Sequence, residues 1–177
     1  MPTGFAHDEL VGNRSERRAR RNKSPKSPKV ARSRTGLGVY AQQRYRPAEL
    51  IGEIEGEVID DLEYSSRYCM DLGDSRCLEP AAPFRFVNHS CVPNCTFQWF
   101  DIRGSDDGAV ERRVFLLARD AIEAGEQLTI DYAWPPAMAI RCQCGEEDCR
   151  GWVVDADALA DLRALQEENG ISREGTI

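Results

Sequence analysis

Short apolar runs, each broken by glycine or turn residues, fill the chain from about residue 30 to residue 132. The runs at 96–100 and 113–117 flank a polar turn at 104–108, a pattern that predicts a hairpin. The other predicted strands are residues 36–41, 50–54, 56–59, 67–72 and 76–78, with one more short strand after the turn at Gly125. Many short strands with few helices predict a mostly β fold.

The C-terminal end has the periodicity of a helix. Asp155 can cap a helix that presents Leu159, Leu162 and Leu165 on one side and ends at Gly170. One short apolar stripe favours packing on the domain over a dimer contact. We therefore expect a single helix and a short tail at this end.

Residues 1–28 form a basic arm that we expect to be disordered. They contain few large apolar residues and two Ser-Pro steps, so they cannot bury enough surface to offset the entropy of ordering. Residues 14–34 carry ten basic groups against one acid, whereas residues 35–177 carry a charge of −14. A solvated tail, contact with a polyanion such as nucleic acid, and folding back on the acidic body all fit this charge, which carries no sequence specificity.

Composition narrows the class of protein. The 177 residues are 41% hydrophobic, enough for one domain with a real core and a short extra segment. No run of about 18 apolar residues predicts a membrane span, and the N-terminus lacks the pattern of a secretory signal. The seven cysteines favour reduced thiols and metal over a disulfide framework. Of these, Cys69 and Cys77 lie in apolar runs, where we interpret them as packed cysteines.

Three cysteines lie within eight residues around a glycine; they are Cys142, Cys144 and Cys149. Thiolates this close suit a tetrahedral zinc ion, with one position left for water or for a distant residue. Cys91 and Cys95 are the candidates for a distant ligand. Through a shared metal ion, such a ligand would hold the C-terminal segment on the body, so that metal binding would order the segment.

Two polar segments carry further candidate chemistry. Residues 85–95 read Arg-Phe-Val-Asn-His-Ser-Cys-Val-Pro-Asn-Cys, and residues 125–132 form a turn and a short strand that ends at Tyr132. His89 is a candidate base or ligand, although a histidine beside Asn and Ser is more often a hydrogen-bonded structural residue. Tyr132 by itself fits either a core aromatic or a catalytic hydroxyl.

These segments resemble, in order, the motifs of the SET-domain protein lysine methyltransferases. Residues 36–41 are similar to the first glycine motif of that family, 85–94 to its RFxNHSCxPN signature and 125–132 to its GEELTxDY signature. Residues 142–151 are similar to its zinc-binding post-SET segment. The resemblance covers about residues 30–153. It divides the chain into a basic arm (1–28), a SET domain (29–135), a post-SET zinc segment (136–153) and a C-terminal helix and tail (154–177).

The resemblance implies small curved β-sheets with a knot-like threaded segment. S-adenosylmethionine would lie on one face and the substrate lysine on the other, joined by a narrow channel. Tyr132 would be the catalytic residue, and Cys91 would complete a structural Zn²⁺ site, leaving Cys95 out. The resemblance assigns cofactor binding to Leu37, Gly38, Asn88, His89 and Trp152. It assigns the lysine channel to Ile130, Tyr132 and Trp134.

Methyl transfer from a sulfonium to an amine requires a deprotonated lysine aligned with the methyl group and the sulfur. A dry channel beside a positive sulfur lowers the pKa of the lysine through desolvation and repulsion between like charges. The hydroxyl of Tyr132 can orient the amine without ionising, because an unperturbed tyrosine has a pKa of about 10. We interpret His89 as a positioning residue and not as a base.

Two features depart from the family. The stretch between Ile59 and Arg67, where the family usually inserts a substrate-shaping segment, is very short. Ile130 stands where the family commonly has Phe or Tyr, and a tyrosine there is held to position a water that limits methyl addition. We therefore expect this protein to allow di- or trimethylation.

The acidic body favours a basic partner, so we expect a histone-like tail, another basic protein or the arm itself as substrate. Lys23, Lys26 and Lys29 are the three lysines of the chain, and self-methylation would fall on them. Two other functions fit: a SET-like binding module without turnover, and a zinc-dependent nucleic-acid binder that uses the arm. We expect a microbial protein that works in the cytoplasm or is delivered to a host nucleus, where it would act on chromatin.

Overall fold

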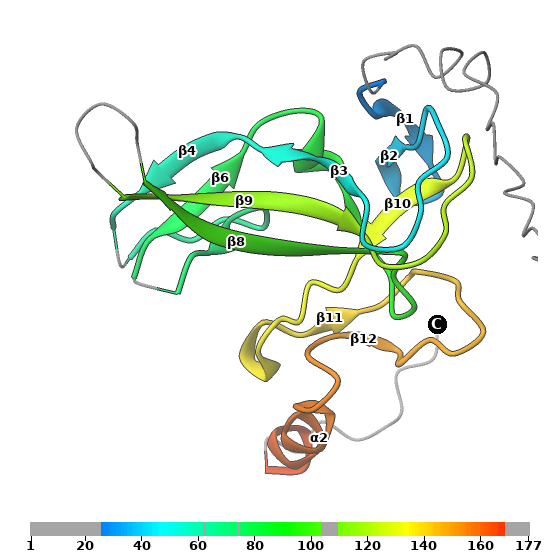
Figure 1. Cartoon of the computed structure of the whole chain (residues 1–177). Helices are drawn as coiled ribbons and strands as arrows, with labels where there is room; N and C mark the ends of the chain where they lie inside the picture. Colours follow the sequence, from blue (N-terminus) through cyan, green and yellow to red (C-terminus); the bar gives the residue numbers. More distant parts are fainter. Residues whose placement is uncertain (1–25, 62, 74, 104–109, 169–177) are drawn as a thin grey trace, which may run out of the picture.

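Four small β-sheets make up most of the fold (Figure 1). The computed structural model describes residues 26–61, 63–73, 75–103 and 110–168. The first sheet, in the order β1-β2-β10-β7, contains β1 (Lys29–Ser33), β2 (Gly36–Tyr40), β10 (Gln127–Ile130) and β7 (Asn88–His89). The second sheet contains β3 (Leu50–Ile54), β9 (Val110–Ala118) and β8 (Cys95–Arg103). The prediction of a mostly β fold is confirmed.

The remaining elements are short. The third sheet contains β4 (Gly56–Ile59), β6 (Cys77–Pro80) and β5 (Met70–Asp71). The fourth pairs β11 (Ile140–Arg141) with β12 (Trp152–Val153) below the other sheets (Figure 1). Three helical segments complete the described chain: η1 (Phe84–Phe86), η2 (Pro136–Met138) and α2 (Leu159–Glu168).

The predicted hairpin at 96–100 and 113–117 is confirmed and is longer than expected. β8 and β9 pair antiparallel from Cys95 opposite Ala118 to Arg103 opposite Val110. Every second residue at the end of β9 is buried, namely Val114, Leu116 and Ala118. This alternation places one face of the hairpin on the core, as a period of two requires.

The predicted strand at 67–72 is wrong over most of its length, since only Met70 and Asp71 pair with β6. The side chain of Ser66 sets up a turn instead. Its hydroxyl accepts a hydrogen bond from the Tyr68 N–H (3.0 Å), and its carbonyl accepts one from the Cys69 thiol (3.2 Å). Local bonds from a serine compete with a strand ladder in this way.

The basic arm lies almost entirely outside the described residues, which begin at Lys26. The described end of the arm contacts the body. Pro28 is buried, and the backbone N–H of Lys26 donates to Gln43 Oε1 at 3.2 Å. β1 starts one residue later, at Lys29, and pairs with β2.

The predicted C-terminal helix is present as α2. Asp155 accepts a hydrogen bond from the Asp157 N–H (2.8 Å) in the turn before the helix, and Leu162 is buried. α2 packs on η2, which favours the predicted packing on the domain. Gly170, where we expected the helix to end, lies outside the described residues. Within the described residues, no helix is both long and apolar enough to cross a bilayer.

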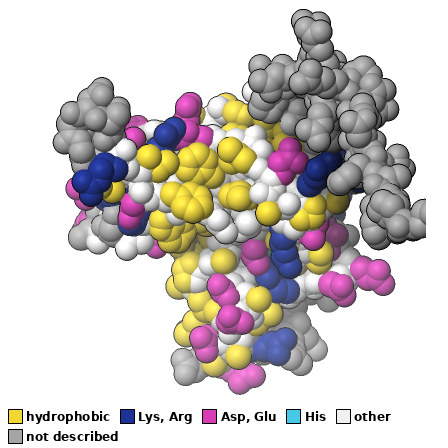
Figure 2. All heavy atoms as spheres, in the orientation of Figure 1, with side chains coloured by type: hydrophobic (Ala, Val, Ile, Leu, Met, Phe, Trp, Pro, Cys, Tyr) yellow, Lys and Arg dark blue, Asp and Glu magenta, His cyan; other side chains and the backbone are white. Residues whose placement is uncertain are grey.

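The core joins the first three sheets into one cluster. Its most deeply buried members include Val39, Tyr45, Leu116 and Leu128. Other apolar side chains remain on the surface, among them Leu50, Trp99 and Phe100. Figure 2 shows hydrophobic side chains gathered over the region of β8 and β9 on one face of the molecule. Leu128 and Ile130 anchor β10 in this core, and β7 pairs with β10. These two strands carry the candidate site.

Candidate active site

Two hollows, each of about 540 Å³, meet at Tyr132. The aromatic hollow has a lining that includes Tyr64, Tyr68, Phe97, Trp99 and Trp134. The polar hollow has a lining that includes Arg34, Asn88, His89, Thr129, Arg141 and Glu146. Among the described residues, Tyr132 and Arg67 are the two that line both hollows. A group placed at Tyr132 is therefore accessible from two sides.

Tyr132 lies two residues after the end of β10 and is held by backbone and ring contacts. Its hydroxyl donates to the carbonyl of Val87 at 2.9 Å, and its backbone N–H donates to His89 Nδ1 at 3.2 Å. Its ring lies 5.5 Å from that of His89 and 5.3 Å from that of Trp134. Burial, followed by the nearby Tyr68, raises the pKa of Tyr132 to about 12. The hydroxyl is therefore neutral at physiological pH and can position a group without ionising.

His89 connects Tyr132 to the cysteine cluster. Its Nδ1 accepts the Tyr132 N–H, and its Nε2 lies 3.4 Å from Cys91 Sγ. Burial lowers the pKa of His89, although Asp131 opposes this effect. We assign a neutral ring with the proton on Nε2, because Nδ1 already accepts a hydrogen bond. Since both nitrogens are engaged, the side chain fits a positioning role better than that of a base.

The residues assigned to cofactor binding lie in two places. Asn88 and His89 line the polar hollow, and Asn88 Nδ2 donates to the Leu37 carbonyl at 2.9 Å. Leu37 and Gly38 are not among the described lining residues, and Leu37 is 47% exposed. The Asn88 amide thus ties the β1–β2 hairpin to β7 and fixes one side of the polar hollow.

Trp152 is not among the described residues that line the polar hollow, but it contacts one of them. The guanidinium carbon of Arg141, which lines that hollow, lies 4.1 Å from the centroid of the Trp152 ring. The two residues are also paired across β11 and β12. Trp152 therefore holds a residue of the hollow wall in place.

Ile130, Tyr132 and Trp134, the residues assigned to the lysine channel, all line the aromatic hollow. Ile130 is 8% exposed and contributes an apolar surface to this wall. Arg85 closes another part of the same hollow. Its guanidinium carbon lies 4.2 Å from the centroid of the Tyr68 ring, and it pairs with Glu79 at 2.9 Å.

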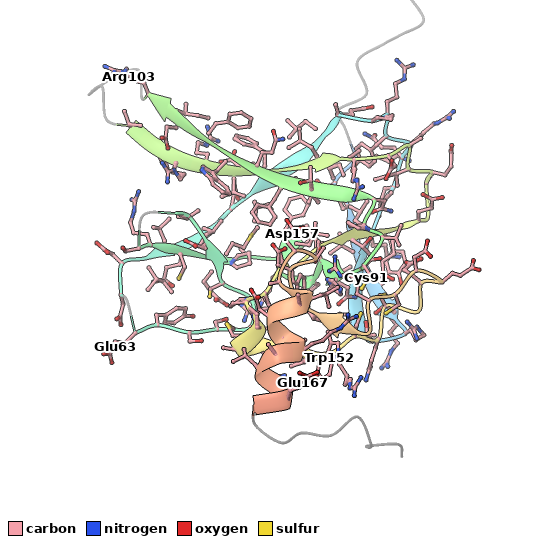
Figure 3. All side chains as sticks on the ribbon, turned by 90° about the horizontal axis from the view of Figure 1, so that it is seen from below. Glu63, Cys91, Arg103, Trp152, Asp157 and Glu167 are labelled. Atoms are coloured by element: carbon pink, nitrogen blue, oxygen red, sulfur yellow. The ribbon has the colours of Figure 1, made fainter. Side chains whose placement is uncertain are left out.

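Four cysteines form one cluster whose sulfur atoms all lie within 4.8 Å of one another; they are Cys91, Cys142, Cys144 and Cys149. Cys91 Sγ lies 3.7 Å from Cys142 Sγ and 3.9 Å from Cys149 Sγ. Sulfur ligands about 2.3 Å from a tetrahedral zinc ion stand roughly 3.8 Å apart, so the cluster fits Zn²⁺. Figure 3 shows Cys91 at the boundary between the body and the C-terminal segment.

Of Cys91 and Cys95, Cys91 is the one that lies in the cluster. Cys95 begins β8 and is 1% exposed within the core, where its thiol donates to Asn94 Oδ1 at 3.3 Å. The backbone N–H groups of Cys144 and Gly151 donate to the sulfurs of Cys142 and Cys149, at 3.3 and 3.4 Å. Hydrogen bonds to metal ligands of this kind help to orient them around the ion.

Contacts that the sequence analysis missed also hold the C-terminal segment on the body. Arg150 donates to both carboxylate oxygens of Asp131, at 2.6 and 2.7 Å. Burial would raise the pKa of Asp131, but Arg150 and neighbouring donors hold it below its ordinary value. The hydroxyl of Ser90 donates to Glu146 at 3.1 Å, and Arg34 donates to the Gln143 carbonyl. Arg150 directly follows Cys149, and Arg34 lies two residues before the glycine motif at 36–41. These positions beside two motifs were the sequence signals that could have indicated a structural role for the two arginines.

Comparison with known proteins agrees with this arrangement. The family model of the SET domain matches residues 36–133. The histone-lysine N-methyltransferase ASHR3 of Arabidopsis thaliana is 31% identical over 168 residues, which cover 85% of this chain and 31% of that protein. The histone-lysine N-methyltransferase set-2 of Caenorhabditis elegans is 34% identical over 142 residues, covering 71% of this chain and 9% of that protein. This chain thus spans about a third or less of these relatives.

Two solved structures share the fold. A crystal structure of KRYPTONITE in complex with mCHG DNA and SAH has a TM-score of 0.61 and 26% identity, covering 71% of this chain and 28% of that chain. A second, in complex with mCHH DNA, H3(1-15) peptide and SAH, has a TM-score of 0.56 and 26% identity, covering 71% of this chain and 29% of that chain.

Proposed function

Since this chain belongs to the SET-domain family, we propose that it is a protein-lysine N-methyltransferase that uses S-adenosylmethionine. The observation that carries the proposal is the place of Tyr132, where two hollows meet. A methyl donor in one hollow and a lysine in the other would face each other across its hydroxyl. The relatives named histone-lysine N-methyltransferases and the SAH in both similar structures support this reaction.

The polar hollow is the proposed cofactor site. S-adenosylmethionine, when bound, supplies a methyl group on a positively charged sulfur. Asn88 and His89 form one wall of this hollow, and Cys144 and Glu146 form part of the wall on the C-terminal segment. Zn²⁺ held by the four clustered cysteines would keep that second wall in place.

The aromatic hollow is the proposed lysine site. Ile130 and Trp134 offer the lysine side chain an apolar wall, which favours its neutral amine over the ammonium. The Tyr132 hydroxyl donates its hydrogen to the Val87 carbonyl, so its free lone pairs can accept a hydrogen bond from the amine. Because its pKa is raised to about 12, Tyr132 orients the nucleophile and does not remove its proton.

A basic, lysine-containing protein tail is the proposed substrate. The charge of −14 over residues 35–177 would steer such a tail toward the body. The lining of the aromatic hollow itself carries both signs, with Asp61 and Asp71 opposed by Arg67, Arg76 and Arg85. We propose that net charge governs the approach and that four of these groups, Asp61, Asp71, Arg76 and Arg85, govern which residues flank the lysine. The H3(1-15) peptide in one similar structure supports a tail of this kind.

Methylation of its own arm is part of this proposal. Lys29 lies in β1 and pairs with Tyr40, so its backbone would have to leave the sheet to enter a hollow. Lys26 precedes the strand and is exposed, and Lys23 lies outside the described residues. We propose Lys23 and Lys26, rather than Lys29, as the self-methylation sites.

A methyl-transfer assay with radiolabelled S-adenosylmethionine tests the proposed function. Core histones and a bacterial lysate are offered to the wild type, to Tyr132→Phe and to a variant that lacks residues 1–25. Label that appears with the wild type and disappears with Tyr132→Phe supports a lysine methyltransferase. SAH binding without label on any substrate would favour a binding module without turnover. DNA binding that falls steeply with salt, without SAH binding, would favour a nucleic-acid binder instead.

A further inference from the structure

Arg67 occupies a position at the junction of the two hollows that the proposed mechanism has not used. It lies three residues before β5 and lines both the aromatic and the polar hollow, as Tyr132 does. Its side chain is exposed. A cation placed here can reach a ligand in either hollow.

Among the described residues that line the polar hollow, three are arginines: Arg34, Arg67 and Arg141. Arg34 donates to the carbonyl of Gln143, and Arg141 stacks over the ring of Trp152 at 4.1 Å. Within the described part of the chain, Arg67 has no hydrogen bond, ion pair or ring contact that would engage its guanidinium. Within the described residues, Arg67 is therefore the arginine of the polar hollow whose guanidinium is not already held by another group of the protein.

The proposed cofactor carries an anionic group at the matching position. Methyl transfer at Tyr132 requires the cofactor sulfur to lie close to this residue, and the methionine carboxylate is connected to the sulfur by single bonds spanning roughly 5 Å. The one acidic residue in the described lining of the polar hollow, Glu146, already accepts a hydrogen bond from Ser90. A carboxylate in this hollow would thus meet the Arg67 guanidinium, which no other described residue engages.

We propose that Arg67 binds the carboxylate of the methionine portion of S-adenosylmethionine. The assignment rests on the proposed function, since it presumes that the polar hollow holds this cofactor. A guanidinium presents parallel N–H donors that match the two oxygens of a carboxylate. The contact would fix the methionine end of the cofactor and thereby the direction of its sulfur toward Tyr132.

The test compares two ligands that differ by this carboxylate alone. SAH carries it, and decarboxylated SAH keeps the sulfur, the amine and the adenosine. Calorimetry gives the Kd of both ligands for wild type, Arg67→Met, Arg67→Lys and Arg44→Met. Arg67→Met keeps an unbranched side chain without charge. Arg44 is the matched control, because it is an exposed arginine that pairs with Glu123 and lines neither hollow.

We expect wild type and Arg44→Met to prefer SAH over decarboxylated SAH by about tenfold. Arg67→Met should lose this preference, and Arg67→Lys should keep part of it because the charge remains without the planar fork. The four Kd values for wild type and Arg67→Met with the two ligands form a thermodynamic cycle. This cycle separates the interaction between the guanidinium and the carboxylate from general effects of the substitution on the fold.

Arg67→Met with an unchanged preference for SAH would overturn the assignment while leaving the cofactor site in place. If the same variant instead raised the KM of an acidic-flanked peptide, Arg67 would belong to the substrate side. Wild type that bound neither ligand would overturn the proposed cofactor together with this assignment, so the two failures are distinguishable.

Discussion

At the scale of single residues, the site depends on how Tyr132 is held. Its hydroxyl donates to the Val87 carbonyl, its backbone N–H donates to His89, and its ring lies near the rings of His89 and Trp134. Few of these contacts depend on charge, because the pKa of Tyr132 is raised and Nδ1 of His89 acts as an acceptor. The geometry of the hydroxyl is therefore set by packing and by neutral hydrogen bonds.

Replacing Tyr132 with Phe should lower methyl transfer by about a hundredfold or more, because the amine loses the group that aligns it. The fold should lose only about 1 kcal/mol, the typical value of one hydrogen bond. Initial rates and thermal unfolding check the two effects separately. Activity within a few fold of wild type would show that this hydroxyl does not align the nucleophile.

Ile130 should determine how many methyl groups are added. It lines the aromatic hollow and has no hydroxyl to hold a water there. We expect wild type to form di- or trimethyl-lysine, Ile130→Tyr to stop earlier, and Ile130→Phe to serve as the control that adds volume without a hydroxyl. Mass spectrometry of the product under excess cofactor decides, and wild type that stops at monomethyl-lysine would refute the prediction.

At the scale of elements, the C-terminal segment packs against the body and forms one wall of the polar hollow. Besides the cysteine cluster, it is held by the Asp131–Arg150 pair, by the bond from Ser90 to Glu146 and by Arg34. The same segment contributes Cys144 and Glu146 to the polar hollow. Metal binding and cofactor binding should therefore be linked.

Cys91→Ser should reduce bound zinc and weaken SAH binding, whereas Cys95→Ser should change neither. Both substitutions exchange one sulfur for one oxygen, but Cys91 belongs to the cluster and Cys95 is buried in the core. Cys95→Ser should instead cost about 1–3 kcal/mol of stability through burial of a hydroxyl. Metal analysis and calorimetry measure the contrast, and equal zinc content in the two variants would contradict it.

Gly145 should matter more than Gly151, although both adopt positive φ angles, of 77° and 79°. A β-carbon at Gly145 would lie 2.8 Å from the guanidinium carbon of Arg34, while one at Gly151 would meet nothing within 4 Å. Both alanine variants should lose about 1 kcal/mol or more through backbone strain. Only Gly145→Ala should also speed SAH dissociation, because it displaces Arg34 from Gln143. Equal off-rates in stopped-flow measurements would disprove this.

At the scale of the whole molecule, the distribution of charge and lysine makes self-methylation traceable. Residues 30–177 contain no lysine, so any label that the protein places on itself at a lysine must fall on Lys23, Lys26 or Lys29. We expect label on Lys23 and Lys26 and little on Lys29, which is paired in β1. Mass spectrometry maps the sites, with each lysine changed to arginine in turn. Methylation mainly at Lys29 would show that β1 opens.

Much of this architecture follows from local patterns along the chain. The apolar runs at 96–100 and 113–117 and the polar turn between them predicted the β8–β9 hairpin. Four ordered motifs indicated the family, and the spacing of Cys142, Cys144 and Cys149 indicated metal. These features lie within short windows, in which neighbouring residues determine one another's conformation.

The tertiary structure decided what depends on residues far apart in the chain. Spacing left Cys91 and Cys95 equivalent, and only the fold places Cys91 3.7 Å from Cys142 while it buries Cys95. Likewise, Arg34 reaches Gln143 across 109 positions of sequence, and Arg67 lines both hollows together with Tyr132. No local pattern encodes such contacts, because they arise when separate sheets pack and bring distant side chains to one place.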